Sequence, residues 1–150
     1  MTIIAIDPGV TTGIAIRDST DQLHTTIVHR QKDLWAIIDK HEPYHVVYEE
    51  FKTPGHISKD GLHTVRLIGA IECYCYTKGI RTILQHPSER RGWLFPAKNM
   101  LKASGKKFLE HEIDALAHLL LYEDRVQRGV LDDMMKLRRT NHIEEILQHV

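Results

Sequence analysis

Short hydrophobic runs separated by turn residues occupy the first thirty positions of the chain. Residues 3–7 are apolar up to Asp7, and residues 13–17 and 23–29 are apolar or alternate apolar and polar side chains. Runs of this length, bounded by Gly, Pro, Asp and Ser, are typical of β-strands joined by tight turns. The pattern therefore predicts three neighbouring strands in an antiparallel meander.

The rest of the chain alternates between helical and strand-like periods. We predict helices over 33–41, 61–78, 108–127 and 131–150, strands over 45–51 and 80–84, and a loop or a short helix within 86–105. Crossover connections between parallel strands are right-handed, which places helices on both faces of the sheet. The expected fold class is α/β: a mixed five-stranded sheet of three meander strands and two crossover strands, flanked by helices.

The helix predicted over 61–78 contains both cysteines of the chain. Its period aligns one stripe of Val65, Ile68, Glu72 and Cys75. Cys73 falls on another face, and the chain has no second cysteine pair to complete a four-ligand zinc site. We therefore expect two plain thiols, buried or half-buried, and a reducing, cytoplasmic setting.

Length and composition limit the class of protein. The 150 residues, 42% of them hydrophobic, suffice for one globular domain over 1–150, with 131–150 as a packing or dimer element. No apolar run approaches the roughly 20 residues that a membrane span needs. The chain opens directly on a strand-like segment, so we expect neither a signal peptide nor membrane association.

Charge is neutral overall but unevenly distributed. The 20 basic and 20 acidic side chains cancel, yet residues 78–108 carry eight basic side chains against Glu89 alone. A concentrated basic segment can attract phosphate groups although the net charge is zero. A solvated helix face is the alternative interpretation of this segment.

Three acidic residues stand at unusual places in the predicted elements. Asp7 ends the first strand, Glu49 ends an apolar β-rich run, and Asp114 lies among apolar helix neighbours. An acid at the end of a buried strand must be exposed, capped or bound to something. The alternatives are a simple Asp-Pro-Gly turn at Asp7 and a surface position at Asp114. Alternation puts Glu49 and Glu50 on opposite faces, and the strand pattern alone does not choose between them.

Convergence of these acids would create a metal site. Clustered carboxylates repel one another unless a cation binds between them, and oxygen ligands suit Mg²⁺ or Mn²⁺. Two such ions about 4 Å apart would activate water and stabilise the leaving oxygen in phosphodiester hydrolysis. His111 and His118 share the helix face of Asp114. We expect His111 to bind a metal or transfer a proton, and His118 to pack or to support a ligand.

Three motifs occur in order along residues 3–128. They are Ile-Ala-Ile-Asp-Pro-Gly-Val-Thr-Thr-Gly at 4–13, Val-Tyr-Glu-Glu-Phe at 47–51 and His-Glu-Ile-Asp-Ala-Leu-Ala-His at 111–118. They resemble the opening strand and turn, the second acidic strand and the C-terminal helix of RuvC-type Holliday junction resolvases, and most of all the compact bacteriophage members. Two features depart from the bacterial pattern. The turn after Asp7 is one residue shorter, and Phe51 lies two rather than three residues after Glu49, where the bacterial enzyme has an aromatic wedge.

The resemblance implies both a fold and an activity. It implies a ribonuclease H-like fold and a homodimer that nicks two opposing strands of a four-way or branched DNA. It also implies two Mg²⁺ or Mn²⁺ ions per site and products ending in 5′-phosphate and 3′-hydroxyl. By position, the catalytic and metal-binding set is Asp7, Glu49, His111 and Asp114. Asp7 would bridge both ions, Glu49 and Asp114 would each complete one site, and His111 would bind a metal or position the water.

Basic side chains would hold DNA phosphates without reading bases. The candidates are Lys52, Lys59, Arg90, Arg91, Lys98, Lys102, Lys106 and Lys107. Trp93 and Phe95 are open to base stacking or to core packing. A dimer would present two active sites to two strands, with the helix over 61–78 and the terminal helix as candidate interface elements.

Three other interpretations stay open. A YqgF-like nuclease for pre-ribosomal RNA would have the same fold and a similar length, although Glu49 fits RuvC better. The turn after Asp7 also resembles the phosphate loop of actin-like ATPases and sugar kinases. Those need two such domains, so we expect no nucleotide cofactor. A non-catalytic junction-binding protein would keep the fold but would not need the acids.

Overall fold

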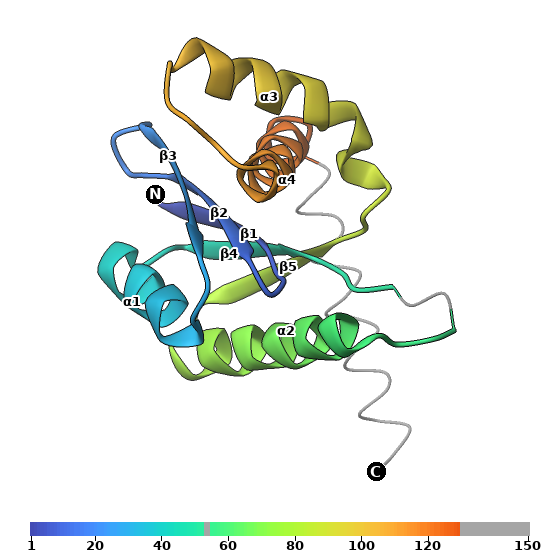
Figure 1. Ribbon diagram of the computed structural model, residues 1–150. Helices are drawn as coiled ribbons and strands as arrows, with labels where there is room; N and C mark the ends of the chain where they lie inside the picture. The colour runs from blue at the N-terminus through green and yellow to red at the C-terminus, as the bar shows by residue number, and fades with distance from the viewer. Residues whose placement is uncertain (53–54, 130–150) are drawn as a thin grey trace.

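A mixed five-stranded sheet organises the protein (Figure 1). The computed structural model describes residues 1–52 and 55–129, and the helix predicted over 131–150 lies outside the described residues. The strands are β1 (Ile3–Asp7), β2 (Thr12–Arg17), β3 (Leu23–Val28), β4 (His45–Glu49) and β5 (Arg81–Gln85), in the order β3-β2-β1-β4-β5. The pairs β1–β2 and β2–β3 are antiparallel, and β1–β4 and β4–β5 are parallel. The predicted meander and the two crossover strands are confirmed.

Helices cover both faces of this sheet (Figure 1). They are α1 (Gln31–His41), α2 (Lys59–Thr77), the short 3₁₀ helix η1 (Glu89–Trp93), α3 (Leu94–Ala103) and α4 (Glu110–Gln127). The first two lie on one face, while α4 lies on the other with η1 and α3 packed outside it. The basic segment is therefore helical for much of its length. Within the described residues, no helix is both long and apolar enough to cross a membrane.

Strand alternation divides the hydrophobic core into two layers. In β1, Ile4 and Ile6 pack toward α1 and α2, while Ile3 and Ala5 pack toward α4. Both sets are buried, which explains why β1 is apolar throughout rather than alternating. The small side chains of Ala5 and Ala15 lie in the α4 layer, where they leave room for the helix.

Gly13 allows α4 to reach the end of β1. In the register of β1 and β2, Gly13 stands opposite Asp7. A Cβ on Gly13 would lie only 1.9 Å from the carbonyl oxygen of His111, in the first turn of α4. No other residue type fits this contact without moving the helix. The start of α4 is thereby held over the carboxyl end of β1.

The buried face of α2 differs from the predicted stripe. Leu67, Ile71 and Cys75 are buried, whereas Val65 and Glu72 are exposed, although Glu72 accepts a hydrogen bond from the Tyr48 hydroxyl. Apolar residues occur on more than one side of α2, so the helical period alone did not select the packed side. Both cysteines are free thiols, as predicted, but Cys73 is exposed rather than buried or half-buried because it lies on the outer side of α2. Burial raises the pKa of Cys75 to about 11.

Candidate active site

The three acids predicted from the sequence lie at one edge of the sheet. Strands β1 and β4 are adjacent and parallel, so Asp7 and Glu49 stand side by side at their carboxyl ends. Asp114 approaches from α4, one helical turn after His111. The side chains of all three acids are largely buried, with exposures of 14% for Asp7, 19% for Glu49 and 19% for Asp114. Glu49, rather than Glu50, therefore takes part in the acid cluster.

His111 contacts the first of these acids. Its Nδ1 lies 2.9 Å from Oδ2 of Asp7, and its side chain is 45% exposed. The contact depends on the close approach of α4 at Gly13, because that approach brings the His111 backbone against β2. His111 therefore lies between Asp7 and solvent, where a substrate or a water could reach it.

His118 supports the second acid from inside the core. It is fully buried, with Nε2 2.8 Å from Oε2 of Glu49 and Nδ1 2.6 Å from Oε1 of Gln85. Gln85 is opposite Glu49 in the register of β4 and β5 and is only 1% exposed. Sequence reasoning missed Gln85, although a polar residue that ends a buried strand was the available signal. These contacts fix the orientation of the Glu49 carboxylate.

Arg90 lies within the acid cluster rather than on the open surface. Its Nε donates a hydrogen bond to Oε2 of Glu49 at 2.6 Å, and Nη1 lies 3.6 Å from Oδ1 of Asp114. Its side chain is 20% exposed. The sequence presented it as one of several phosphate-binding cations, and nothing in the local pattern separated it from Arg91.

The charges of these groups perturb one another. Burial raises the pKa of Asp7 to about 6; the His111 hydrogen bond opposes the rise, and the negative charges of Asp114 and Glu49 add to it. Burial likewise raises the pKa of Asp114, against the charge of Arg90. At Glu49, burial is outweighed by the His118 hydrogen bond and by Arg90, so its pKa is lowered. Among the three acids, Asp7 is thus the one whose burial is least offset by hydrogen bonds and positive charges.

The acids suit a hard divalent cation by chemistry, although not in their present arrangement. Within residues 1–52 and 55–129, no three His, Cys, Asp or Glu side chains are placed to coordinate one ion. Arg90 instead bridges Glu49 and Asp114 with its own positive charge. Oxygen donors from three carboxylates are the ligands that Mg²⁺ and Mn²⁺ prefer. The chemistry of this donor set therefore fits such an ion.

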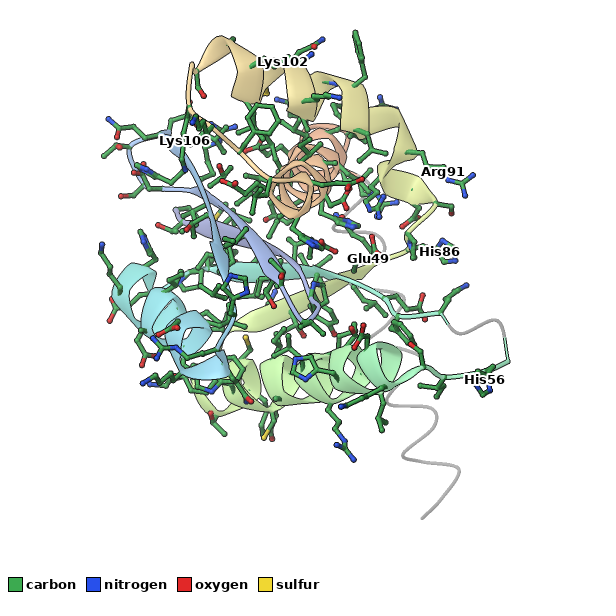
Figure 2. All side chains as sticks on the ribbon, in the orientation of Figure 1. Glu49, His56, His86, Arg91, Lys102 and Lys106 are labelled. Carbon is green, nitrogen blue, oxygen red and sulfur yellow. The ribbon has the colours of Figure 1, made fainter. Side chains whose placement is uncertain are left out.

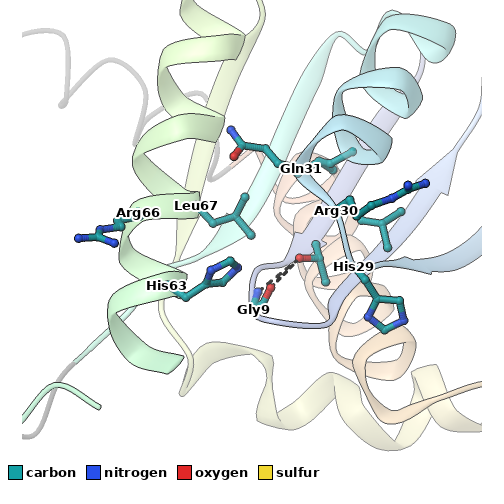
Figure 3. A pocket seen from close by; sticks show the side chains of 10 residues that line it. Gly9, His29, Arg30, Gln31, His63, Arg66 and Leu67 are labelled. Carbon is teal, nitrogen blue, oxygen red and sulfur yellow. Dashed lines mark hydrogen bonds between the residues drawn. The ribbon is translucent and has the colours of Figure 1, made fainter. Parts of the chain in front are cut away.

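The other predicted cations are at the surface. Seven are exposed: Lys52, Lys59, Arg91, Lys98, Lys102, Lys106 and Lys107. Figure 2 shows Arg91 and Lys102 extending away from the helices. Lys106 differs, because its Nζ donates to the Thr25 carbonyl at 2.5 Å and lies 3.6 Å from Oε1 of Glu112. It is bound over β3, and β2 and β1 separate it from Glu49.

The aromatic candidates have different environments. Trp93 is partly buried and packs against the core under α4, whereas Phe95 is 74% exposed. Phe51 is partly buried beside the start of α2, where a Cβ on Gly61 would lie 2.9 Å from its ring. Of these three, Phe95 is therefore the one open to contact with a partner.

No protein-family model and no curated protein matches the sequence. RuvC of T. thermophilus in complex with a Holliday junction substrate matches the structure with a TM-score of 0.69. The match covers 86% of this chain and 97% of that chain, at 16% identity. The fold is that of RuvC. A second Thermus thermophilus RuvC structure matches with a TM-score of 0.67 and the same coverage and identity.

The RuvC fold confirms the fold class expected from the three motifs, a mixed ribonuclease H-like sheet with flanking helices. The closer resemblance to bacteriophage members stays a prediction. Within this fold, Asp7 and Glu49 end β1 and β4, and Asp114 lies on α4.

Proposed function

We propose that this protein is a divalent-metal-dependent endonuclease that resolves four-way or branched DNA by phosphodiester hydrolysis, leaving 5′-phosphate and 3′-hydroxyl ends. One observation carries the proposal: acids from β1, β4 and α4 gather at one sheet edge within a RuvC fold. The matching RuvC structure contains a Holliday junction substrate. A structural role does not require three largely buried acids with incomplete charge compensation.

Each residue of the site has a distinct task in this proposal. Asp7, Glu49 and Asp114 would hold Mg²⁺ or Mn²⁺, which when bound supplies an activated water and charge stabilisation at the leaving oxygen. His118 keeps the Glu49 carboxylate oriented through its 2.8 Å contact. His111 holds Asp7 through Nδ1, and its half-exposed ring leaves Nε2 as the nitrogen for proton transfer.

The surface around η1 and α3 would contact the DNA backbone. Arg91, Lys98 and Lys102 are exposed on these helices, which pack against α4 beside the acids. Such cations bind phosphates independently of sequence, so they position DNA without selecting bases. A homodimer would present two such sites to two opposing strands, as symmetric resolution requires.

The test is cleavage of a labelled mobile four-way junction and a matched linear duplex, with Mg²⁺ or Mn²⁺. The wild type should nick opposing strands of the junction and leave ends that a DNA ligase can rejoin. Asp7→Asn should bind the junction without cutting it. Equal cutting of forks, flaps and junctions would retain the metal chemistry and widen the substrate class.

Two results would contradict the proposal. Junction binding without cleavage in either metal would indicate a non-catalytic junction-binding protein. Cleavage of structured RNA but not of branched DNA would favour the pre-ribosomal-RNA nuclease.

A further inference from the structure

A single guanidinium group links two of the three acids. Arg90 uses Nε for Glu49, at 2.6 Å, and Nη1 for Asp114, at 3.6 Å. The two contacts come from different nitrogens of the same side chain, so one positive charge serves both carboxylates. Arg90 thus lies between two of the three acids that would hold a metal ion.

The helix that carries Arg90 is anchored on both sides of it. Oε1 of Glu89 accepts a hydrogen bond from Arg125 of α4 at 2.7 Å, and Oε2 accepts one from the backbone N–H of His86 at 2.8 Å. Trp93, at the end of η1, packs against the core. With both ends fixed, Arg90 points inward, whereas Arg91 is exposed and points outward (Figure 2). The inward position of Arg90 is therefore built into η1.

Arg90 in its present position and a metal ion between Glu49 and Asp114 would exclude each other. Oε2 of Glu49 already accepts hydrogen bonds from Arg90 and His118. If Glu49 and Asp114 held a divalent ion, the Arg90 guanidinium group would be repelled by its positive charge. Arg90 would then turn outward from an anchored helix at the rim of the site. A guanidinium group released there matches a DNA phosphate, which it can bind through two nitrogens.

We propose that Arg90 is an internal counter-ion, which neutralises Glu49 and Asp114 until a divalent ion arrives and then contacts a phosphate of the DNA strand. This inference rests on the proposed nuclease function. It gives Arg90 two successive partners, carboxylates before metal binding and DNA afterwards. Removing the side chain therefore has opposite effects on metal binding and on cleavage.

The decisive variants are Arg90→Gln and Arg90→Lys, with Arg91→Gln as a control for Mn²⁺ affinity alone, because Arg91 is itself a proposed DNA contact. Mn²⁺ affinity is measured by calorimetry without DNA, and junction cleavage is measured separately at saturating Mn²⁺. Losing a charge-assisted hydrogen bond that competes with the ion should make Arg90→Gln bind Mn²⁺ about tenfold more tightly. Its cleavage rate should fall about tenfold or more, because one phosphate contact is lost. Arg90→Lys, with a single point charge, should lie between Arg90→Gln and wild type.

Arg91→Gln controls for the loss of a neighbouring positive charge. It removes the same charge one residue away, and Arg91 is exposed, so its Mn²⁺ affinity should stay within about twofold of wild type because solvent screens the charge. Circular dichroism and thermal unfolding establish that each variant is folded. If Arg90→Gln is unstable, Arg90→Lys tests the same two changes at a smaller size, because it keeps a positive charge and loses the guanidinium geometry.

The outcomes separate this inference from the proposed function. If wild type cuts junctions and Arg90→Gln binds Mn²⁺ no more tightly, the counter-ion role is wrong and the nuclease function stands. If Arg90→Gln binds Mn²⁺ more tightly and no variant cuts branched DNA, the counter-ion role stands and the nuclease function is wrong. If neither protein binds Mn²⁺, no cation competes with Arg90, and both are wrong.

Discussion

Replacing Gly13 with alanine should separate α4 from the sheet where the acids meet. The added Cβ would lie 1.9 Å from the carbonyl oxygen of His111 and 2.4 Å from its carbonyl carbon. Ordinary van der Waals contact begins at 3.4 Å, so the first turn of α4 would have to retreat by about 1.5 Å. The opposing atoms belong to the backbone, so no change of side-chain rotamer relieves the overlap.

The magnitude follows from this displacement. A retreat of about 1.5 Å would stretch the 2.9 Å contact between His111 and Asp7 beyond hydrogen-bonding range. Overpacking a core contact costs about 1–3 kcal/mol, and the upper value applies where the backbone must move. For a chain of this size, ~3 kcal/mol lowers the unfolding temperature by roughly 6–12 °C.

Thermal unfolding and junction cleavage provide the assay, with Gly69→Ala as the matched control. Gly69 lies in α2, and a Cβ there would meet nothing within 4 Å. Alanine at a helical site should stabilise the protein by up to ~1 kcal/mol. We expect Gly13→Ala to unfold earlier and to cut at least tenfold more slowly, since misplacement by about 1 Å can cost about a hundredfold in rate. If Gly13→Ala melts within about 1 °C of wild type and cuts normally, the close approach of α4 does not assemble the site.

Three further predictions concern the acids and the surface. Burial raises the pKa of Asp7 from 3.8 to about 6, so between these pH values the folded, metal-free protein keeps a proton that the unfolded chain has released. The free energy of unfolding should therefore fall by about 3 kcal/mol in total as pH rises through this range. Urea unfolding at pH 4 and pH 7.5 should therefore show that Asp7→Asn becomes more stable relative to wild type at the higher pH. Equal changes in the free energy of unfolding of the two proteins would contradict this. His118→Asn should lower Mn²⁺ affinity or the cleavage rate about 10–100-fold, because Glu49 loses its buried partner. Cleavage rates measured against Mn²⁺ concentration would show either effect. Unchanged kinetics would mean that His118 contributes only to packing. Lys102→Ala should reduce the salt dependence of junction binding by about one phosphate contact. Lys40→Ala, on α1 across the sheet, should leave the salt dependence unchanged. Equal effects of the two substitutions would mean that the DNA does not bind at η1 and α3.

The predictable part of the protein is the part that short-range patterns encode. The apolar run up to Asp7, the β-rich run over 45–51 and the turn residues between strands identified the sheet and marked Asp7 as a candidate acid. The strand pattern left Glu49 and Glu50 open, and the resemblance to RuvC-type resolvases favoured Glu49. Asp114 stood out because helical spacing surrounded it with apolar neighbours. His118 was expected to pack or to support a ligand, and its burial against Glu49 agrees with that expectation.

The remaining features depend on tertiary packing that no local pattern records. Arg90 and Arg91 are adjacent and chemically alike, and only the anchoring of η1 on α4 directs one inward. Gln85 acquires its role from the pairing of β5 with β4, which brings it opposite Glu49. Lys106 looked like any other lysine of the basic segment until the fold brought it to Thr25.

The proposed metal site can be tested by locating Mn²⁺ in a crystal through its anomalous scattering. The account predicts anomalous density among the carboxylate oxygens of Asp7, Glu49 and Asp114, with Arg90 turned away from Glu49. Crystals of Asp7→Asn, grown in the same Mn²⁺ concentration, should lose or weaken this density. Wild-type crystals in millimolar Mn²⁺ that show no density there, with Arg90 still between Glu49 and Asp114, would contradict the account.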